Sequence, residues 1–236
     1  MNGHTWSRWT QVGLALAVAA APLRGQEGAV RGVVRYRGPM PKLEQLRVTV
    51  DRDVCGDSIP SRHLVVADGR VRHTVVYLEG VSGAATPATT AATATLANRQ
   101  CQFEPSVMAS RVGAVLTLRN DDPMMHNVHL YHSRRTVANV ALPGKAVAQN
   151  RRALSRPGLV EVKCDAHGWM RAAMWVFDHP YYAVTDGDGA FEIGGVPPGR
   201  HVLRVWHAVL GEQSRDIVVE PGQRLTVEFS LGAVAR

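Results

Sequence analysis

The sequence predicts an all-β protein, and three observations support this prediction. After residue 27, apolar residues recur with a period of two, as in half-buried strands, rather than with the 3.6 of a helix. Clusters of Gly, Pro, Asn and Asp separate these runs at short intervals. No stretch after residue 27 has the spacing of a long amphipathic helix. Many short strands with frequent turns are typical of β-sandwiches and Greek-key barrels.

The N-terminus predicts a cleavable signal peptide over residues 1–26. Arg8 precedes an uncharged apolar run over residues 12–23, and small residues follow it up to Gly25. The run is shorter than the roughly 20 residues that span a bilayer, so a short membrane anchor is the weaker alternative. We therefore expect a periplasmic protein with no stable membrane insertion.

Composition divides the rest of the chain into four segments. Residues 27–81 form an N-terminal β segment, and residues 82–97, SGAATPATTAATATLA, form an uncharged Thr/Ala-rich linker. A buried Ala-rich helix is the alternative there, disfavoured by Pro87 and the threonines. Two further β-rich segments follow, at residues 98–178 and 179–236.

A short motif, CDAHGWM, carries the strongest chemical signal. It places the Cys164 thiol, the His167 imidazole and the Met170 thioether within seven residues, between two predicted strands. A tight loop can point all three at one ion. Two histidines, one cysteine and a weak axial methionine define a blue-copper site, so the motif needs a second histidine from elsewhere.

The second histidine is expected in DDPMMHNVH, residues 121–129. His126 and His129 have opposite strand parity, so they should point to opposite faces. We choose His126 because it lies next to the predicted turn, at the rim where the metal loop would sit. His179 and His207 offer an alternative second metal site, although structural roles are favoured for both. The remaining histidines read as ordinary surface or packing residues: His63, His73, His132 and His201.

The region around these motifs resembles the cupredoxins, most closely the amicyanin and plastocyanin group. The matching pieces are FEPSVMASRVGAVLTLRNDDPMMHNVHLY and PGLVEVKCDAHGWMRAAMWVF. The resemblance implies a Greek-key sandwich over residues 98–178 that binds one copper ion. It also implies that Asn127 bonds to Asp165, the residue after the ligand cysteine, and so locks the two ligand loops together. Met125 departs from the family, which commonly has proline there.

A second resemblance is to the carboxypeptidase regulatory-like domain, a small transthyretin-like β-sandwich. It rests on VTDGDGAFEIGGVPPGRHVLRV (184–205) and IVVEPGQRLTVEFSL (217–231), with GAVRGVVRYRGPMP (28–41) and TVVYLEG (74–80) as further pieces. The sandwich is either split by the copper domain or follows it as a consecutive domain.

The chain has three cysteines, and export permits disulfides. If Cys164 is a metal thiolate, Cys55 and Cys101 can pair. Two free buried thiols are the alternative.

These features predict a type 1 copper protein that carries one electron to or from a periplasmic redox protein or enzyme. His167 should form the exposed edge for electron transfer, with Ala166, Gly168 and Trp169 as an apolar docking patch. No motif for catalysis stands out, so we do not expect an enzyme. The formal charge is +7, but its basic residues are scattered, so we expect no nucleic acid. The alternatives are a Cu(I)-binding chaperone module, or a cell-envelope carbohydrate- or protein-binding sandwich with an incidental copper site.

Overall fold

A computed structural model describes residues 26–81, 93–150 and 154–232. The predicted all-β class is confirmed, because these residues form twenty strands and one helix of a single turn. The predicted signal peptide lies, apart from its last residue, outside the described residues. No helix in the described ranges is long and apolar enough to cross a membrane. The elements are β1 (Gly28–Arg37), β2 (Gln45–Arg47), α1 (Arg52–Cys55), β3 (Ser58–Pro60), β4 (Val66–Ala67), β5 (Arg70–Val71), β6 (Val75–Glu79), β7 (Thr93–Arg99), β8 (Gln102–Glu104), β9 (Val107–Arg111), β10 (Val115–Asn120), β11 (His126–His132), β12 (Arg135–Leu142), β13 (Val147–Asn150), β14 (Gly158–Lys163), β15 (Arg171–Phe177), β16 (Tyr182–Val184), β17 (Ala190–Val196), β18 (Gly199–His207), β19 (Gly211–Val219) and β20 (Arg224–Gly232).

Strands from both ends of the chain build one sandwich, which we call the outer sandwich. Strand β1 lies between β20, to which it pairs in parallel, and β17. The facing sheet has the order β16-β6-β18-β19, so β6 lies between strands that come from the C-terminal part of the chain. Alternation along β20 buries Val227, Phe229 and Leu231 and exposes the residues between them.

Strands β7–β15 build a second sandwich, which we call the inserted sandwich. Its sheets have the orders β13-β10-β7-β8 and β12-β11-β14-β15-β9. Its core contains Phe103, Leu116, Leu118, Leu130 and Met174, all nearly or fully buried. Because β1 and β6 precede these strands and β16–β20 follow them, the outer sandwich is split in sequence by the inserted one.

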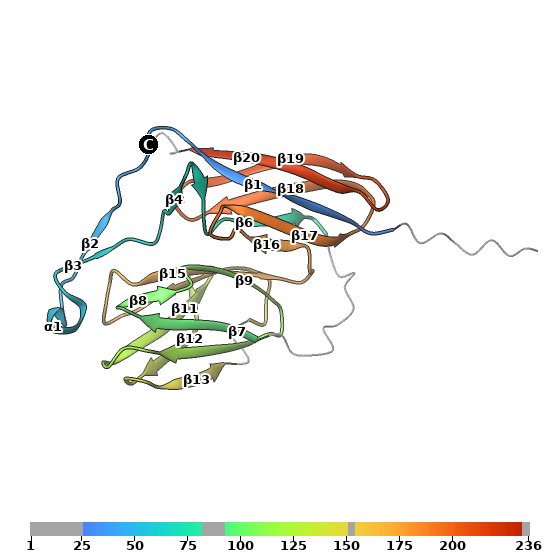
Figure 1. Cartoon of the computed structure of the whole chain (residues 1–236). Helices are drawn as coiled ribbons and strands as arrows, with labels where there is room; N and C mark the ends of the chain where they lie inside the picture. The colour runs from blue at the N-terminus through green and yellow to red at the C-terminus, as the bar shows by residue number, and fades with distance from the viewer. Residues whose placement is uncertain (1–25, 82–92, 151–153, 233–236) are drawn as a thin grey trace, which may run out of the picture.

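The four large sheets stack as layers, with the outer sandwich above the inserted one in Figure 1. A cluster of side chains joins the two sandwiches where β6 faces β9 and β15: Val75, Tyr77, Val107, Ala173 and Phe177. The ring centroids of Tyr77 and Trp175 lie 5.2 Å apart across this junction. An aromatic pair of this kind stabilises the junction beyond the effect of the apolar area that it buries.

The expected linker over residues 82–97 is wrong at its C-terminal end. Thr93–Ala97 belongs to β7, which pairs in parallel with β10 inside the inserted sandwich. Ala94 and Leu96 face the core, while Thr93 and Thr95 face outward. Alanine differs little in hydrophobicity from its threonine neighbours, so the period-two pattern is weak in this Thr/Ala-rich stretch. Residues 82–92 lie outside the described part of the chain.

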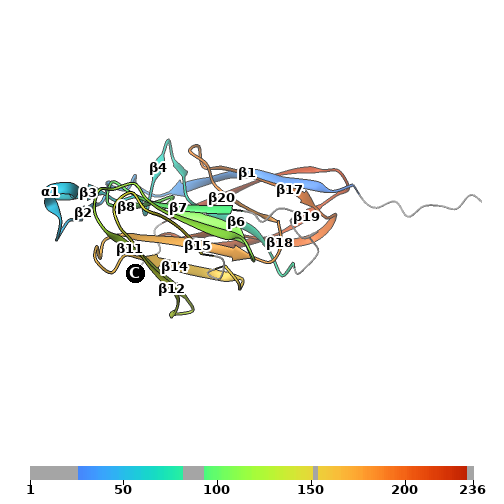
Figure 2. The same cartoon turned by 90° about the horizontal axis from the view of Figure 1, so that it is seen from below.

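The expected N-terminal segment, residues 27–81, also does not belong to a single sandwich. Residues 45–60 leave the outer sandwich as a small excursion that contains β2, α1 and β3, and we call this excursion the cap. It projects from one end of the layers in both views (Figures 1 and 2). Val48 and Ile59 of the cap are buried in the core of the inserted sandwich.

The cap is also tied covalently to the inserted sandwich. Cys55, at the end of α1, forms a disulfide with Cys101, in the turn between β7 and β8. Cys164 is the one free cysteine and is buried. The structure therefore contains the disulfide that the cysteine count suggested and leaves the third thiol available.

Candidate metal centre

Three of the predicted ligands lie on the loop between β14 and β15. The loop closes on itself, because the Met170 N–H donates to the His167 carbonyl (2.8 Å) and the Cys164 N–H donates to the Met170 carbonyl (3.3 Å). At its base, Lys163 and Arg171 are cross-strand partners in the antiparallel ladder. A short loop on a paired strand frame holds its side chains with little freedom. Met170 is 1% exposed.

The fourth predicted ligand is the first residue of β11. His126 follows the turn after β10 and points into the protein, where it is fully buried. His129 points to the opposite face, where its Nδ1 lies 2.9 Å from an Asp165 carboxylate oxygen. Strand parity therefore separates the two histidines as the sequence indicated.

The side chains from these two distant segments converge. The Nδ1 atoms of His126 and His167 lie 3.0 Å apart, and Cys164 Sγ lies 3.4 Å from His167 Nδ1. One ligand atom from each of these three residues lies within 4.8 Å of the others, and all three residues are buried. Within the described ranges, this is the one group of three such side chains arranged this way.

The donor set fits one metal ion. Nitrogen ligands sit about 2.1 Å and thiolate sulfur about 2.3 Å from a bound ion, so two such atoms lie up to about 4 Å apart. The separations of 3.0 and 3.4 Å fall within that reach. A thiolate with two imidazoles suits copper or zinc, and a thioether as a further ligand would favour copper.

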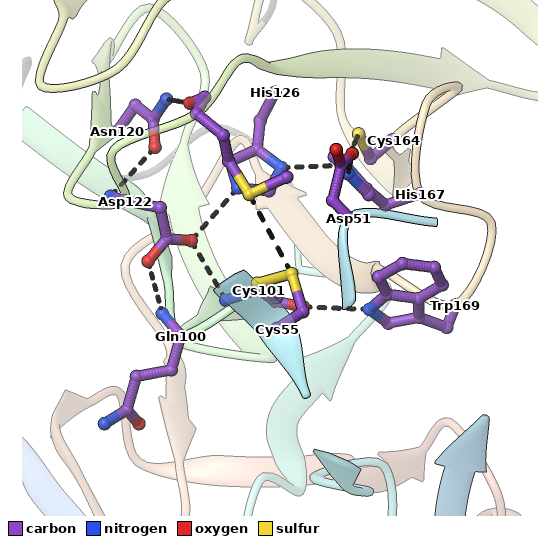
Figure 3. The surroundings of a disulfide bond; sticks show 11 residues. Asp51, Cys55, Gln100, Cys101, Asn120, Asp122, His126, Cys164, His167 and Trp169 are labelled. Atoms are coloured by element: carbon purple, nitrogen blue, oxygen red, sulfur yellow. Dashed lines mark hydrogen bonds and ion pairs between the residues drawn. A yellow bond between two sulfur atoms is a disulfide. The ribbon is translucent and has the colours of Figure 1, made fainter. Parts of the chain in front are cut away.

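Each of the two imidazoles has a carboxylate on its far side (Figure 3). Asp122 Oδ2 lies 3.0 Å from His126 Nε2, and Asp51 Oδ2 lies 2.9 Å from His167 Nε2. A carboxylate that accepts from the Nε2–H of a histidine leaves its Nδ1 lone pair free for a metal. Both histidines are therefore oriented with Nδ1 toward the shared space.

Asp122 is fixed by backbone donors as well as by His126. Its two carboxylate oxygens accept the N–H groups of Gln100 (2.7 Å) and Cys101 (2.9 Å). Asn120 holds the same turn, since its side-chain oxygen accepts the Asp122 N–H at 3.1 Å. Burial lowers the pKa of His126, the charge of His167 lowers it further, and Asp122 opposes both effects.

A second polar link joins the two ligand segments. Asn127 Oδ1 accepts the backbone N–H of Asp165 at 2.7 Å and lies 3.3 Å from Cys164 Sγ. The Asn127 amide also donates to the Asp165 carboxylate at 2.9 Å. The contact implied by the cupredoxin resemblance is thus present in the structure.

The expected exposure of His167 is wrong. His167 is 1% exposed and Trp169 is 9% exposed, so these two do not form a surface patch. The Trp169 indole N–H donates to the Cys101 carbonyl, beside the disulfide (Figure 3). The cap covers this end of the inserted sandwich and brings Asp51 onto His167. Sequence reasoning treated residues 27–81 as part of another domain and therefore missed this cover.

Two residues of the site, Asp51 and Asp122, were not predicted. Asp122 had a local signal, because it precedes His126 by four residues in a turn that was already identified. Asp51 lies 116 positions before His167, and nothing in its surroundings indicates contact with the metal loop.

Comparison with known families finds one match. Residues 171–232 match the family model described as "Carboxypeptidase regulatory-like domain". The match covers β15 to β20 and so supports the regulatory-like resemblance for the C-terminal part of the chain. Comparison with curated proteins finds no match.

Several solved structures resemble part of the chain. A purple cupredoxin from Nitrosopumilus maritimus is 19% identical, covering 36% of this chain and 99% of that one, with a TM-score of 0.31. An amicyanin mutant with Cu(I) is 19% identical, covering 43% and 98%, with a TM-score of 0.32. The Cu-containing nitrite reductase from Thermus scotoductus is 15% identical, covering 49% of this chain and 25% of that one, with a TM-score of 0.33.

Proposed function

We propose that the inserted sandwich binds one copper ion in a type 1 site and acts as a one-electron carrier in the periplasm. The observation that supports this proposal is that three buried residues from two distant segments converge: His126, Cys164 and His167. Their ligand atoms lie within 4.8 Å of one another. Met170 would supply the weak axial ligand. The copper ion would gain or lose the electron by cycling between Cu(II) and Cu(I).

The arrangement supports electron transfer better than catalysis. With two imidazoles, a thiolate and a thioether from the protein, no coordination position is left for a substrate, whereas catalytic metal sites keep one open. The ligand residues lie on paired β-strands and on a loop whose ends are joined by backbone hydrogen bonds. This arrangement would limit movement of the ligands when the ion changes its oxidation state. We therefore assign the protein a partner that is a periplasmic redox protein or enzyme, and no reaction of its own.

Burial favours a carrier over a Cu(I) chaperone. The three converging residues are 0–3% exposed, and two carboxylates fix the imidazoles from behind. A protein that passes its ion to another protein needs ligands that the acceptor can reach. A retained ion, which exchanges only electrons, needs no such access.

The test is the visible and EPR spectrum of the copper-loaded mature protein. We expect an intense thiolate-to-copper absorption band that bleaches on reduction and returns on oxidation. Cys164→Ser should lose this band entirely, because it removes the thiolate.

His129→Gln is the matched control, because His129 lies three residues from His126 but on the opposite face. It should keep the band. A wild-type protein that binds copper without the band would contradict the proposal. Tight Cu(I) binding with no coloured Cu(II) form would favour the chaperone instead.

A further inference from the structure

The cap is held rigidly against the candidate metal centre, although it belongs to the N-terminal part of the chain. The Cys55–Cys101 disulfide joins it to the β7–β8 turn. Leu46 and Ile59 are partners in the β2–β3 ladder, and Ile59 and Val48 are buried in the core of the inserted sandwich. The β2–β3 ladder closes the cap on itself, and the disulfide and the two buried side chains fix this segment of sixteen residues, 45–60, at this end of the molecule.

Asp51 has an unusual backbone conformation within the cap. Its φ is +52°, in the left-handed region that Asp adopts more readily than most residues. Its carbonyl accepts the N–H groups of Val54 (3.1 Å) and Cys55 (2.9 Å), so its position is fixed relative to the disulfide.

The Asp51 side chain is directed at the metal loop rather than at its own helix. An aspartate at the N-cap commonly accepts a backbone N–H of the first turn, but this one makes no such bond. Its Oδ2 instead lies 2.9 Å from His167 Nε2. The carboxylate therefore serves a residue 116 positions away.

The consequences for His167 are chemical and steric. An Nε2–H that donates to a carboxylate leaves Nδ1, the atom facing His126 and Cys164, as the free ligand atom. The added negative charge favours the more positive, oxidised state of a bound ion. The cap also leaves only 1% of His167 exposed, so a large partner cannot touch this imidazole directly.

We propose that the cap completes the metal centre, with Asp51 as a positioning residue that selects Nδ1 of His167 as the ligand and lowers the reduction potential. This rests on the proposed copper function. The other imidazole has its carboxylate, Asp122, within the inserted sandwich itself. The centre is therefore finished only when a segment from outside that sandwich folds onto it.

The experiment compares Asp51→Ala and Asp51→Asn with Asp57→Asn. Asp57 is the matched control, because it lies in the same cap, carries the same charge and has a side chain that is 90% exposed. Two readouts are used: the protonated nitrogen of His167 by ¹⁵N NMR in the copper-free protein, and the copper affinity and reduction potential of the loaded protein.

Asp51→Ala should lose the dominance of the Nε2-protonated form of His167, weaken copper binding by about 10- to 100-fold and raise the potential. Asp51→Asn keeps an acceptor without the charge, so it should retain the Nε2-protonated form and still raise the potential. Asp57→Asn should match the wild type in every readout.

An Asp51→Ala protein with wild-type His167 protonation and wild-type potential would overturn the positioning role. Failure of the underlying copper function gives a different result. In that case the wild type would bind no copper with a thiolate band, while the NMR comparison would still decide whether Asp51 orients His167.

Discussion

The two sandwiches each bury histidines, but they use the imidazole in opposite ways. In the inserted sandwich, His126 and His167 have Nε2 on a carboxylate and Nδ1 facing shared space. In the outer sandwich, His207 is equally buried, at 1% exposed, but its Nδ1 accepts the N–H groups of Val209 (3.1 Å) and Leu210 (3.2 Å).

This difference shows that burial alone does not make a histidine a ligand. Because Nδ1 of His207 is an acceptor, the neutral ring carries its proton on Nε2, which has no hydrogen-bond partner in the described part of the chain. Neither nitrogen then offers a lone pair to a metal. His207 is a structural histidine that stabilises the turn after β18, whereas the other pair is preorganised for an ion.

The largest predicted effect tests whether the two sandwiches unfold independently of each other. Gly32 lies in the middle of β1, where an added Cβ would sit 1.7 Å from the Val227 carbonyl oxygen. Because that neighbour is backbone, β1 and β20 would have to separate. We expect Gly32→Ala to lower the free energy of unfolding of the outer sandwich by more than about 4 kcal/mol, measured by urea denaturation and circular dichroism.

Gly194→Ala is the control, because Gly194 lies in the same sheet and a Cβ there meets nothing within 4 Å. It should change stability by less than about 1 kcal/mol. The copper absorption of Gly32→Ala should survive to higher urea than the outer sandwich does. Simultaneous loss of both signals would show instead that the sandwiches unfold as one unit.

A second prediction uses pH to separate the two kinds of histidine. Burial, together with the smaller effects of the nearby His73 and His63, lowers the pKa of His207 from 6.5 to about 4. Above pH 6.5 neither the folded nor the unfolded chain protonates this ring. Between pH 6.5 and about 4 only the unfolded chain does, so stability falls by up to roughly 3 kcal/mol across that window.

The measurement is urea unfolding of copper-free protein between pH 7.5 and 4.5. His207→Gln should be less stable than the wild type at pH 7.5, because two backbone donors lose their acceptor, but it should lose less stability on acidification. His201→Gln, a half-buried position on the same strand, should keep the wild-type slope. An unchanged slope in His207→Gln would contradict the assigned shift.

Local patterns predicted the parts of the centre that depend on local structure. The metal loop is one strand–loop–strand unit, and parity along β11 distinguishes His126 from His129, so both could be read from spacing. The Cys55–Cys101 pairing followed from counting once Cys164 had a role. The all-β class followed from alternation of the kind that β20 shows.

Long-range packing was the part that sequence could not supply. Asp51 reaches His167 only because Val48, Ile59 and Cys55 anchor the cap to a different sandwich. Val48 and Ile59 carry no signal of their own, and the predicted Cys55–Cys101 pairing does not say where Asp51 points. The expected exposure of His167 failed for the same reason. Strand β7 was missed because alanine at a core position gives almost no hydrophobic contrast with its threonine neighbours.

The smallest predicted effect contrasts a conspicuous surface carboxylate contact with the buried ones. Arg204 on β18 makes bonds of 2.7 Å to both carboxylate oxygens of Glu79 on β6, and one of 2.9 Å to Glu212. The Glu79 side chain is 43% exposed, so water and salt screen the charges. We expect Arg204→Met to cost less than about 1 kcal/mol in urea unfolding, and less still in high salt. A cost above about 2 kcal/mol that persists in salt would mean that this pair is desolvated like Asp122 and His126. The outer sandwich would then have a polar anchor comparable to the one that organises the metal centre.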